Sequence, residues 1–66
     1  MPSLTLNGDP REVAATTVAA LRDELVLAGV PVLVERNGTA LFPRDFGTTP
    51  VAAGDRLEII RVVAGG

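Results

Sequence analysis

The apolar residues at the start of the chain alternate with polar ones, which is typical of a half-buried β-strand. Leu4-Thr5-Leu6 shows this alternation. The next four residues, Asn7–Pro10, are all common in turns. Arg11–Ala15 then provides a second extended segment. The pattern predicts an antiparallel hairpin formed by residues 4–6 and 11–15.

The following segment changes to a helical period, and it predicts a helix over residues 17–28. Thr17 is suited to cap the helix, because its hydroxyl can accept a hydrogen bond from an amide of the first turn. Gly29 and Pro31 are suited to end it. Leu27 falls on the side opposite the apolar stripe, so we expect it to be exposed. The stripe itself consists of Val18, Leu21, Leu25 and Ala28.

A second hairpin is expected after the helix. Val32–Glu35 has the pattern of a buried strand, and Ala40–Phe42 that of a short returning strand. Between them, Asn37-Gly38 is the strongest signal in the chain for a type I′ turn, in which both central residues need a positive φ. Pro43 then fits the first position of a helical turn over residues 43–46.

The chain closes with a turn at Ala53-Gly54-Asp55 and a β-branched run from Leu57 to Val63 that predicts the last strand. The resulting order of elements is hairpin, helix, hairpin, strand, with the last strand beside the first. This order predicts an α+β fold of the β-grasp, or ubiquitin-like, type, with a mixed sheet of four to five strands and one main helix across one face. We expect residues 1–66 to form one domain with a C-terminal tail. The predicted core between helix and sheet is Leu4, Leu6, Val18, Leu21, Leu25, Val34, Leu57 and Ile59.

The composition excludes several kinds of chemistry. The chain has no cysteine, histidine or lysine, so it lacks thiol nucleophiles, imidazole bases and the usual zinc ligands. The net charge of −2 is unlike the basic footprint of a nucleic-acid-binding protein. Apolar runs are too short to span a membrane, and no signal peptide is apparent, so we expect a cytoplasmic protein. The adjacent carboxylates Asp23 and Glu24 are expected to be solvated. No catalytic constellation or metal site is evident, and we expect no enzyme.

The chemistry of interest lies in the tail, Ala64-Gly65-Gly66. Glycine has no Cβ, so this segment is narrow and can thread a tight channel in a partner enzyme. The carboxylate of Gly66 is a poor electrophile until it is converted to an acyl-adenylate, from which AMP can leave. Nothing in the chain can perform this activation. A partner that binds ATP must therefore do so, and this protein is expected to be the carrier.

Several motifs resemble the ThiS family of sulfur carriers. The ending Gly54–Gly66, the turn Asn37-Gly38 followed by Pro43-Arg44, and the helix opening Thr17-Val18 all fit that family. The resemblance covers nearly the whole chain. The family usually carries an aromatic residue, often tryptophan, slightly further beyond its Pro-Arg motif than Phe46 is here.

The resemblance implies a reaction cycle centred on Gly66. An E1-like adenylyltransferase of the ThiF type would adenylate the carboxylate with ATP and magnesium, neither of which this chain would bind itself. Sulfur from a donor such as a cysteine desulfurase, carried as a persulfide, would convert it to a thiocarboxylate. A thiazole synthase of the ThiG type would then take the sulfur for thiamin.

Two alternatives stay open at this stage. The small subunit of molybdopterin synthase, of the MoaD type, shares the fold, the tail and the thiocarboxylate. Its approach to the tail usually contains prolines, whereas Ile60-Arg61-Val62 has none. A protein modifier or a ubiquitin-like binding module is the other alternative. A modifier would end as an isopeptide on a lysine, and a binding module would not need its terminus.

The final strand also predicts a docking surface. Since side chains alternate along a strand, Leu57 and Ile59 should point to the helix, while Ile60 and Val62 should point to the opposite face. Leu33 on the neighbouring strand is expected beside them. Exposed apolar patches tend to mark interaction sites. We therefore expect Ile60, Val62 and Leu33 to contact the adenylating enzyme.

Overall fold

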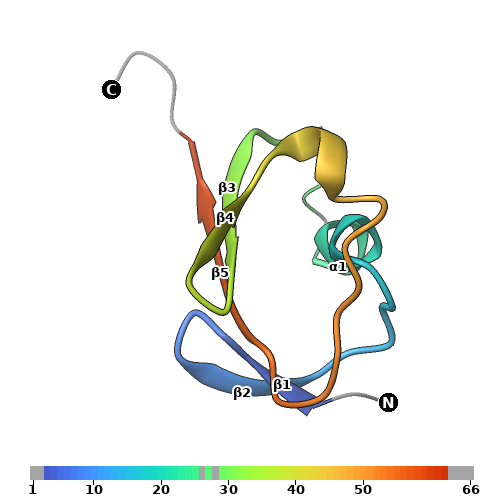
Figure 1. Cartoon of the computed structure of the whole chain (residues 1–66), viewed down its shortest axis with the longest axis vertical. Coiled ribbons are helices and arrows are strands. Elements are labelled where there is room, and N and C mark those ends of the chain that lie inside the picture. The colour runs from blue at the N-terminus through green and yellow to red at the C-terminus, as the bar shows by residue number, and fades with distance from the viewer. Residues whose placement is uncertain (1–2, 26, 28, 63–66) are drawn as a thin grey trace.

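A computed structural model describes residues 3–25, 27 and 29–62 of the chain. It contains one five-stranded sheet in the order β2-β1-β5-β3-β4, with helix α1 across one face (Figure 1). The central pair β1 and β5 is parallel, and the other neighbours are antiparallel. This is the predicted β-grasp arrangement. The elements are β1 (Ser3–Leu6), β2 (Asp9–Glu12), α1 (Val18–Glu24), β3 (Val32–Arg36), β4 (Thr39–Leu41), η1 (Pro43–Asp45) and β5 (Arg56–Arg61).

The first hairpin turns earlier than the sequence pattern predicted. Only Asn7 and Gly8 form the turn, with φ values of 50° and 88°. Pro10 lies within β2 and pairs with Thr5, at an outer edge of the sheet where its missing N–H costs no hydrogen bond. The prediction of a strand over residues 11–15 was therefore wrong: the strand runs from Asp9 to Glu12. It starts earlier because a two-residue turn with positive φ at both positions already reverses the chain.

Helix α1 begins as predicted and ends earlier. The Thr17 hydroxyl accepts a hydrogen bond of 3.1 Å from the amide of Ala20, which confirms the N-cap. The last helical residue is Glu24, rather than residue 28. Beyond it, the amide of Leu27 donates to the carbonyl of Arg22, five residues back, so the chain has left α-helical geometry, in which this step is four residues.

This early end places Leu27 differently from the prediction. Leu27 is partly buried and packs against the core, because it follows the wider turn and does not lie on the helix surface. The expectation that Leu27 is exposed was wrong. Ala28, which was expected to complete the apolar stripe, lies outside the described residues.

The loop between η1 and β5 holds the start of the helix. The amides of Val18 and Ala19 donate to the carbonyls of Thr49 and Phe46, each at 2.9 Å. Val51 donates in turn to the carbonyl of Thr16. The first amides of a helix have no partner within the helix. This loop supplies partners for two of them, and Figure 1 shows it running beside α1 on its way to β5.

The core contains most of the predicted residues and several others. Six of the eight predicted residues are buried, while Leu6 and Leu25 are partly buried and pack against them. The sequence pattern did not identify residues that lie in irregular segments or at strand ends, where no period marks them. These are Val13, Ala15, Val32, Phe46 and Val51.

The second hairpin has the predicted turn, with φ values of 52° at Asn37 and 85° at Gly38. Strand β3 was predicted to be buried, but only one of its faces is: Val32 and Val34 are buried, while Leu33 and Glu35 are exposed. The reason is that the helix covers one face of the sheet only. The predicted helical turn over residues 43–46 is confirmed as the short 3-10 helix η1, with Pro43 at its start.

Truncating the core at α1 tests this packing. Leu21 is fully buried, so Leu21→Ala should destabilise the domain by roughly 2–5 kcal/mol. A domain of this size has only about 3–5 kcal/mol of net stability, and the variant should unfold at a much lower urea concentration or not fold at all. The matched control is Leu33→Ala, since Leu33 is 62% exposed. It should change stability by less than about 0.5 kcal/mol. Similar urea midpoints for the two variants would contradict this assignment of the core.

Candidate docking face and carrier tail

Strand β5 precedes the tail, and it is held on both sides. On the β1 side, the amide group of the Asn7 side chain bonds the backbone of Ile59 twice: Oδ1 accepts from the Ile59 amide at 2.8 Å, and Nδ2 donates to its carbonyl at 3.1 Å. Asn7 thereby continues the pairing of the two parallel strands past the end of β1. These two bonds fix the backbone of Ile59. The next residue, Ile60, is the first exposed apolar residue of the strand.

On the β3 side, the Asn37 side chain has a similar role. Its Oδ1 accepts from the amide of Arg56 at 2.8 Å, and its Nδ2 donates to Asp55 at 3.2 Å. Among the described residues, two turn residues other than glycine have a positive φ, and both are asparagines. Asn7 bonds β5, and Asn37 bonds both β5 and the residue before it. Asparagine tolerates this backbone region, and its amide can both donate and accept.

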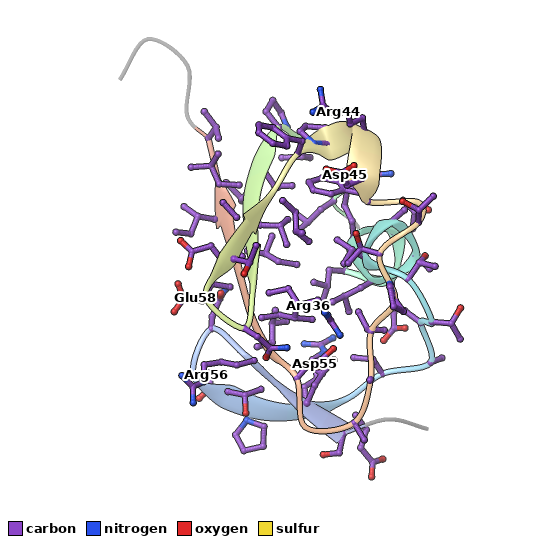
Figure 2. All side chains as sticks on the ribbon, viewed as in Figure 1. Arg36, Arg44, Asp45, Asp55, Arg56 and Glu58 are labelled. Carbon is purple, nitrogen blue, oxygen red and sulfur yellow. The ribbon has the colours of Figure 1, made fainter. Side chains whose placement is uncertain are left out.

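Asp55, directly before β5, is the buried carboxylate of the described core. It accepts a bond of 3.0 Å from Arg36 Nε and one of 2.8 Å from the Ala52 amide, in addition to that from Asn37 (Figure 2). Burial raises the pKa of Asp55, but these hydrogen bonds and the Arg36 charge outweigh it, and the pKa lies below its ordinary value. The ionised side chain therefore stabilises the turn that sets the start of β5.

The three residues expected to form the docking surface are exposed together on the sheet face away from α1, which we call the outer face. Leu33 is 62% exposed, Ile60 56% and Val62 47%. Leu33 and Ile60 are directly opposite each other in the pairing of β3 and β5. Their predicted position is confirmed, and their contact with a partner stays a prediction. The tail residues Ala64, Gly65 and Gly66 lie outside the described residues.

Phe42 extends this surface, and the sequence analysis missed it. Its side chain is 61% exposed, and its backbone is extended directly after β4. Since Val34 pairs with Leu41, Phe42 continues the ladder opposite Leu33. The guanidinium carbon of Arg44 lies 4.7 Å from the centre of the Phe42 ring. The alternation of Ala40 and Phe42 along the strand was the available signal. We call Phe42, Leu33, Ile60 and Val62 the apolar row.

The remainder of the outer face near the apolar row is charged. Glu35 and Glu58 are exposed and pair directly across β3 and β5. Together with Arg56 and Gly38 they line a shallow hollow. Figure 2 shows Glu58 and Arg56 pointing away from the helix, whereas Arg36 and Asp55 meet on the helix side of the sheet.

Within the described ranges, there is no group of three or more carboxylate, cysteine or histidine residues able to hold a metal ion. Nor does the described part of the chain contain a helix long and apolar enough to cross a membrane.

Glu24, expected to be merely solvated, has a structural role. Its Oε1 accepts from the amides of Ala14 and Ala15, each at 3.0 Å, and so ties the end of α1 to the segment after β2.

Comparison with known proteins identifies the family. A sequence model of the ThiS family matches residues 4–66, almost the entire chain. The chain belongs to the ThiS family. It is therefore a small sulfur carrier of thiamin biosynthesis, and it acts with partner proteins of that pathway.

A solved structure agrees with this assignment. The crystal structure of a thiamine biosynthesis protein (ThiS) from Geobacter metallireducens is 35% identical in sequence, with a TM-score of 0.82. The similarity covers 97% of this chain and 99% of that chain. No curated protein sequence matches significantly. Both matches name ThiS, and this favours the resemblance to ThiS over the MoaD-type alternative.

The Asp55 network predicts a pH-dependent loss of stability. An unfolded aspartate titrates near pH ~3.9. Because the folded-state pKa of Asp55 is lower, its carboxylate stabilises the fold above about pH 4, and this contribution is lost as the pH falls through the folded pKa. Asp55→Asn should therefore cost roughly 1–3 kcal/mol at pH 7 and progressively less below pH ~4. Thermal melts at several pH values measure this.

Asp23→Asn is the matched control. The Asp23 side chain is 59% exposed, and its ion pair with Arg22 is long, at 3.6 Å between Arg22 Nε and Asp23 Oδ1. This control should be close to wild type at every pH. An Asp55→Asn protein as stable as wild type at pH 7 would contradict the role given to the network.

Proposed function

We propose that the Gly66 carboxylate is the group that carries sulfur. An E1-like adenylating enzyme of the ThiF type converts it to an acyl-adenylate, with ATP and magnesium bound by that enzyme. The terminal sulfur of a donor persulfide, such as that of a cysteine desulfurase, then displaces AMP and gives an acyl disulfide. A thiol reductant cleaves the acyl disulfide and releases the thiocarboxylate, which a ThiG-type thiazole synthase consumes. The protein is a co-substrate of these cytoplasmic partners, and its own side chains perform no chemistry.

The observation that carries this proposal is the apolar row, which crosses the outer face from Phe42 through Leu33 to Ile60 and then continues along the chain to Val62, toward the tail. Four residues follow Val62, and a fully extended segment of that length spans at most about 14 Å. An enzyme that acts on the Gly66 carboxylate must therefore approach within this distance of Val62. Among the described residues, Val62 and Ile60 are the exposed apolar side chains nearest along the chain to that point.

The composition and the matches give further support. The chain has no cysteine that could form a persulfide, so the sulfur has to be supplied from outside the chain. A carboxylate needs a better leaving group than oxide before sulfur can replace oxygen, and adenylation supplies AMP in that role. The family match extends to residue 66, so it includes the glycine pair on which the proposal depends.

The tail provides the first test. Gly65→Ala and Gly66→Ala each add a methyl group and restrict the backbone in the segment that must enter the partner's channel. The core of the described residues is complete without these positions, so we expect wild-type melting curves. Thiocarboxylate formation should fall by at least about tenfold, measured by intact-protein mass spectrometry as sulfur replacing one oxygen.

The control is wild-type protein incubated with the same adenylating enzyme, sulfur donor, thiol reductant, ATP and magnesium. Sulfuration of either alanine variant at the wild-type rate would show that the narrow tail is not required. Failure of the wild type itself to acquire sulfur would contradict the proposed function. Appearance of a conjugate of higher mass with another protein would instead support a modifier.

The docking face provides the second test. Ile60→Asp should keep the fold, since Ile60 is exposed, and should weaken binding to the adenylating enzyme by about tenfold or more, because a charge is placed in the centre of an apolar contact. The matched control is Ala53→Asp, which adds the same charge at an exposed turn position before β5. Equal rates of sulfuration for both variants, with normal circular dichroism melts, would show that Ile60 is not in the interface.

A further inference from the structure

The outer face carries a pair of like charges that does not stabilise the fold. Glu35 and Glu58 are directly opposed in the β3–β5 ladder, where Cβ atoms are about 4.5–5.5 Å apart. Like charges in this position destabilise a sheet. Neither glutamate belongs to an ion pair formed within residues 3–62 as the structure describes them. The pair is thus an unfavourable feature of the isolated domain.

The neighbouring cation does not remove this repulsion. Arg56 lies on the same face, two residues before Glu58, and lines the same hollow, but its guanidinium is not within ion-pair distance of either carboxylate. Gly38 forms the remaining wall, and a Cβ built on it would meet no atom within 4 Å. The space beside the two carboxylates is therefore open to a side chain from another molecule.

The acidic pair is continuous with the apolar row. Leu33 and Ile60 form the next outward-facing pair along the same two strands, two residues from Glu35 and Glu58. The two pairs are therefore roughly 7 Å apart. The glutamates lie on the side of Ile60 away from the tail, so a partner whose contact extends about 7 Å beyond Ile60 in that direction also reaches them. Interfaces commonly have such an apolar centre bordered by charge.

The apolar row is bordered at Phe42 by a basic side chain. Arg44 stacks on Phe42, which continues the ladder beyond Leu33, while Glu58 lies toward the start of β5 (Figure 2). The face thus has a cation at Phe42, the apolar row beside it, and on the far side of that row the acidic pair with Arg56 in the same hollow. A partner rotated by half a turn on this face would place like charges together, and such juxtapositions are strongly unfavourable.

We propose that Glu35 and Glu58 together receive a basic side chain, an arginine, of the adenylating partner, and that this contact steers and orients docking so that the tail enters the active site. The proposal rests on the proposed function, because it concerns the same encounter. A guanidinium has donors in a planar fork that can bridge two carboxylates, and its charge relieves their mutual repulsion. Such charge pairs act chiefly on the association rate.

The test is charge reversal on the outer face. Glu58→Lys places a cation opposite Glu35, so the cross-strand pair becomes favourable, and the variant should melt at or above the wild-type temperature. Its association rate with the ThiF-type enzyme, measured by stopped flow at low ionic strength, should nevertheless fall by about tenfold or more. The association rate of the variant should depend less on salt concentration than that of the wild type. The adenylation rate at a saturating concentration of the carrier should stay near wild type.

The matched control is Glu12→Lys, which makes the same change in net charge on strand β2, at an exposed position opposite Ser3. This variant should associate at nearly the wild-type rate. A purely structural role for Glu58 would lower the melting temperature, which is opposite to the result expected here.

The outcomes separate the two proposals. If the wild type is adenylated but Glu58→Lys and Glu12→Lys associate equally fast, the proposed arginine contact is wrong and the sulfur-carrier mechanism stands. If Glu58→Lys associates as fast as wild type, the contact is also wrong. If the wild type is not adenylated at all, the proposed function is wrong, and the contact with an adenylating partner is wrong with it.

Discussion

The hydrogen bonding of the central strand β5 is the constraint on which the rest of the structure depends. β5 pairs in parallel with β1 and antiparallel with β3, and asparagine side chains from the two hairpin turns bond it from both sides. Buried Leu57 and Ile59 join it to the core beneath α1. Because β5 is fixed in this way, the residues that follow it leave the body at a defined place and next to a defined surface.

The two faces of β5 have different roles. Its inward residues hold a small aliphatic core without disulfides, in a chain that has no cysteine. Its outward residues carry the apolar row and one member of the acidic pair, and no described element covers them. The same strand thus supplies stability on one side and a surface for partners on the other. A sheet with one helical layer makes this division possible, because side chains alternate between the faces.

The carrier role is consistent with a sequence that contains no cysteine, histidine or lysine. The reacting group is proposed to be the main-chain carboxylate of Gly66. A carboxylate alone does not distinguish one carrier from another, so the folded domain must provide the surface that a partner recognises. Recognition needs shape, apolar area and charge. The outer face offers these in the apolar row, in Arg44 on Phe42, and in Glu35 opposite Glu58. Family membership, from both the sequence match and the ThiS crystal structure, is consistent with this division of work.

The sequence by itself determined the order of elements, the Thr17 cap, the Asn37-Gly38 turn and the exposure of Ile60, because these depend on local preference and on periods of two or 3.6 residues. Tertiary structure alone decided the end of α1 at Glu24 and the burial of Leu27 and Phe46, since these follow from the space left beside the sheet. It also decided that Glu35 meets Glu58, because residues distant in sequence become neighbours only through strand register.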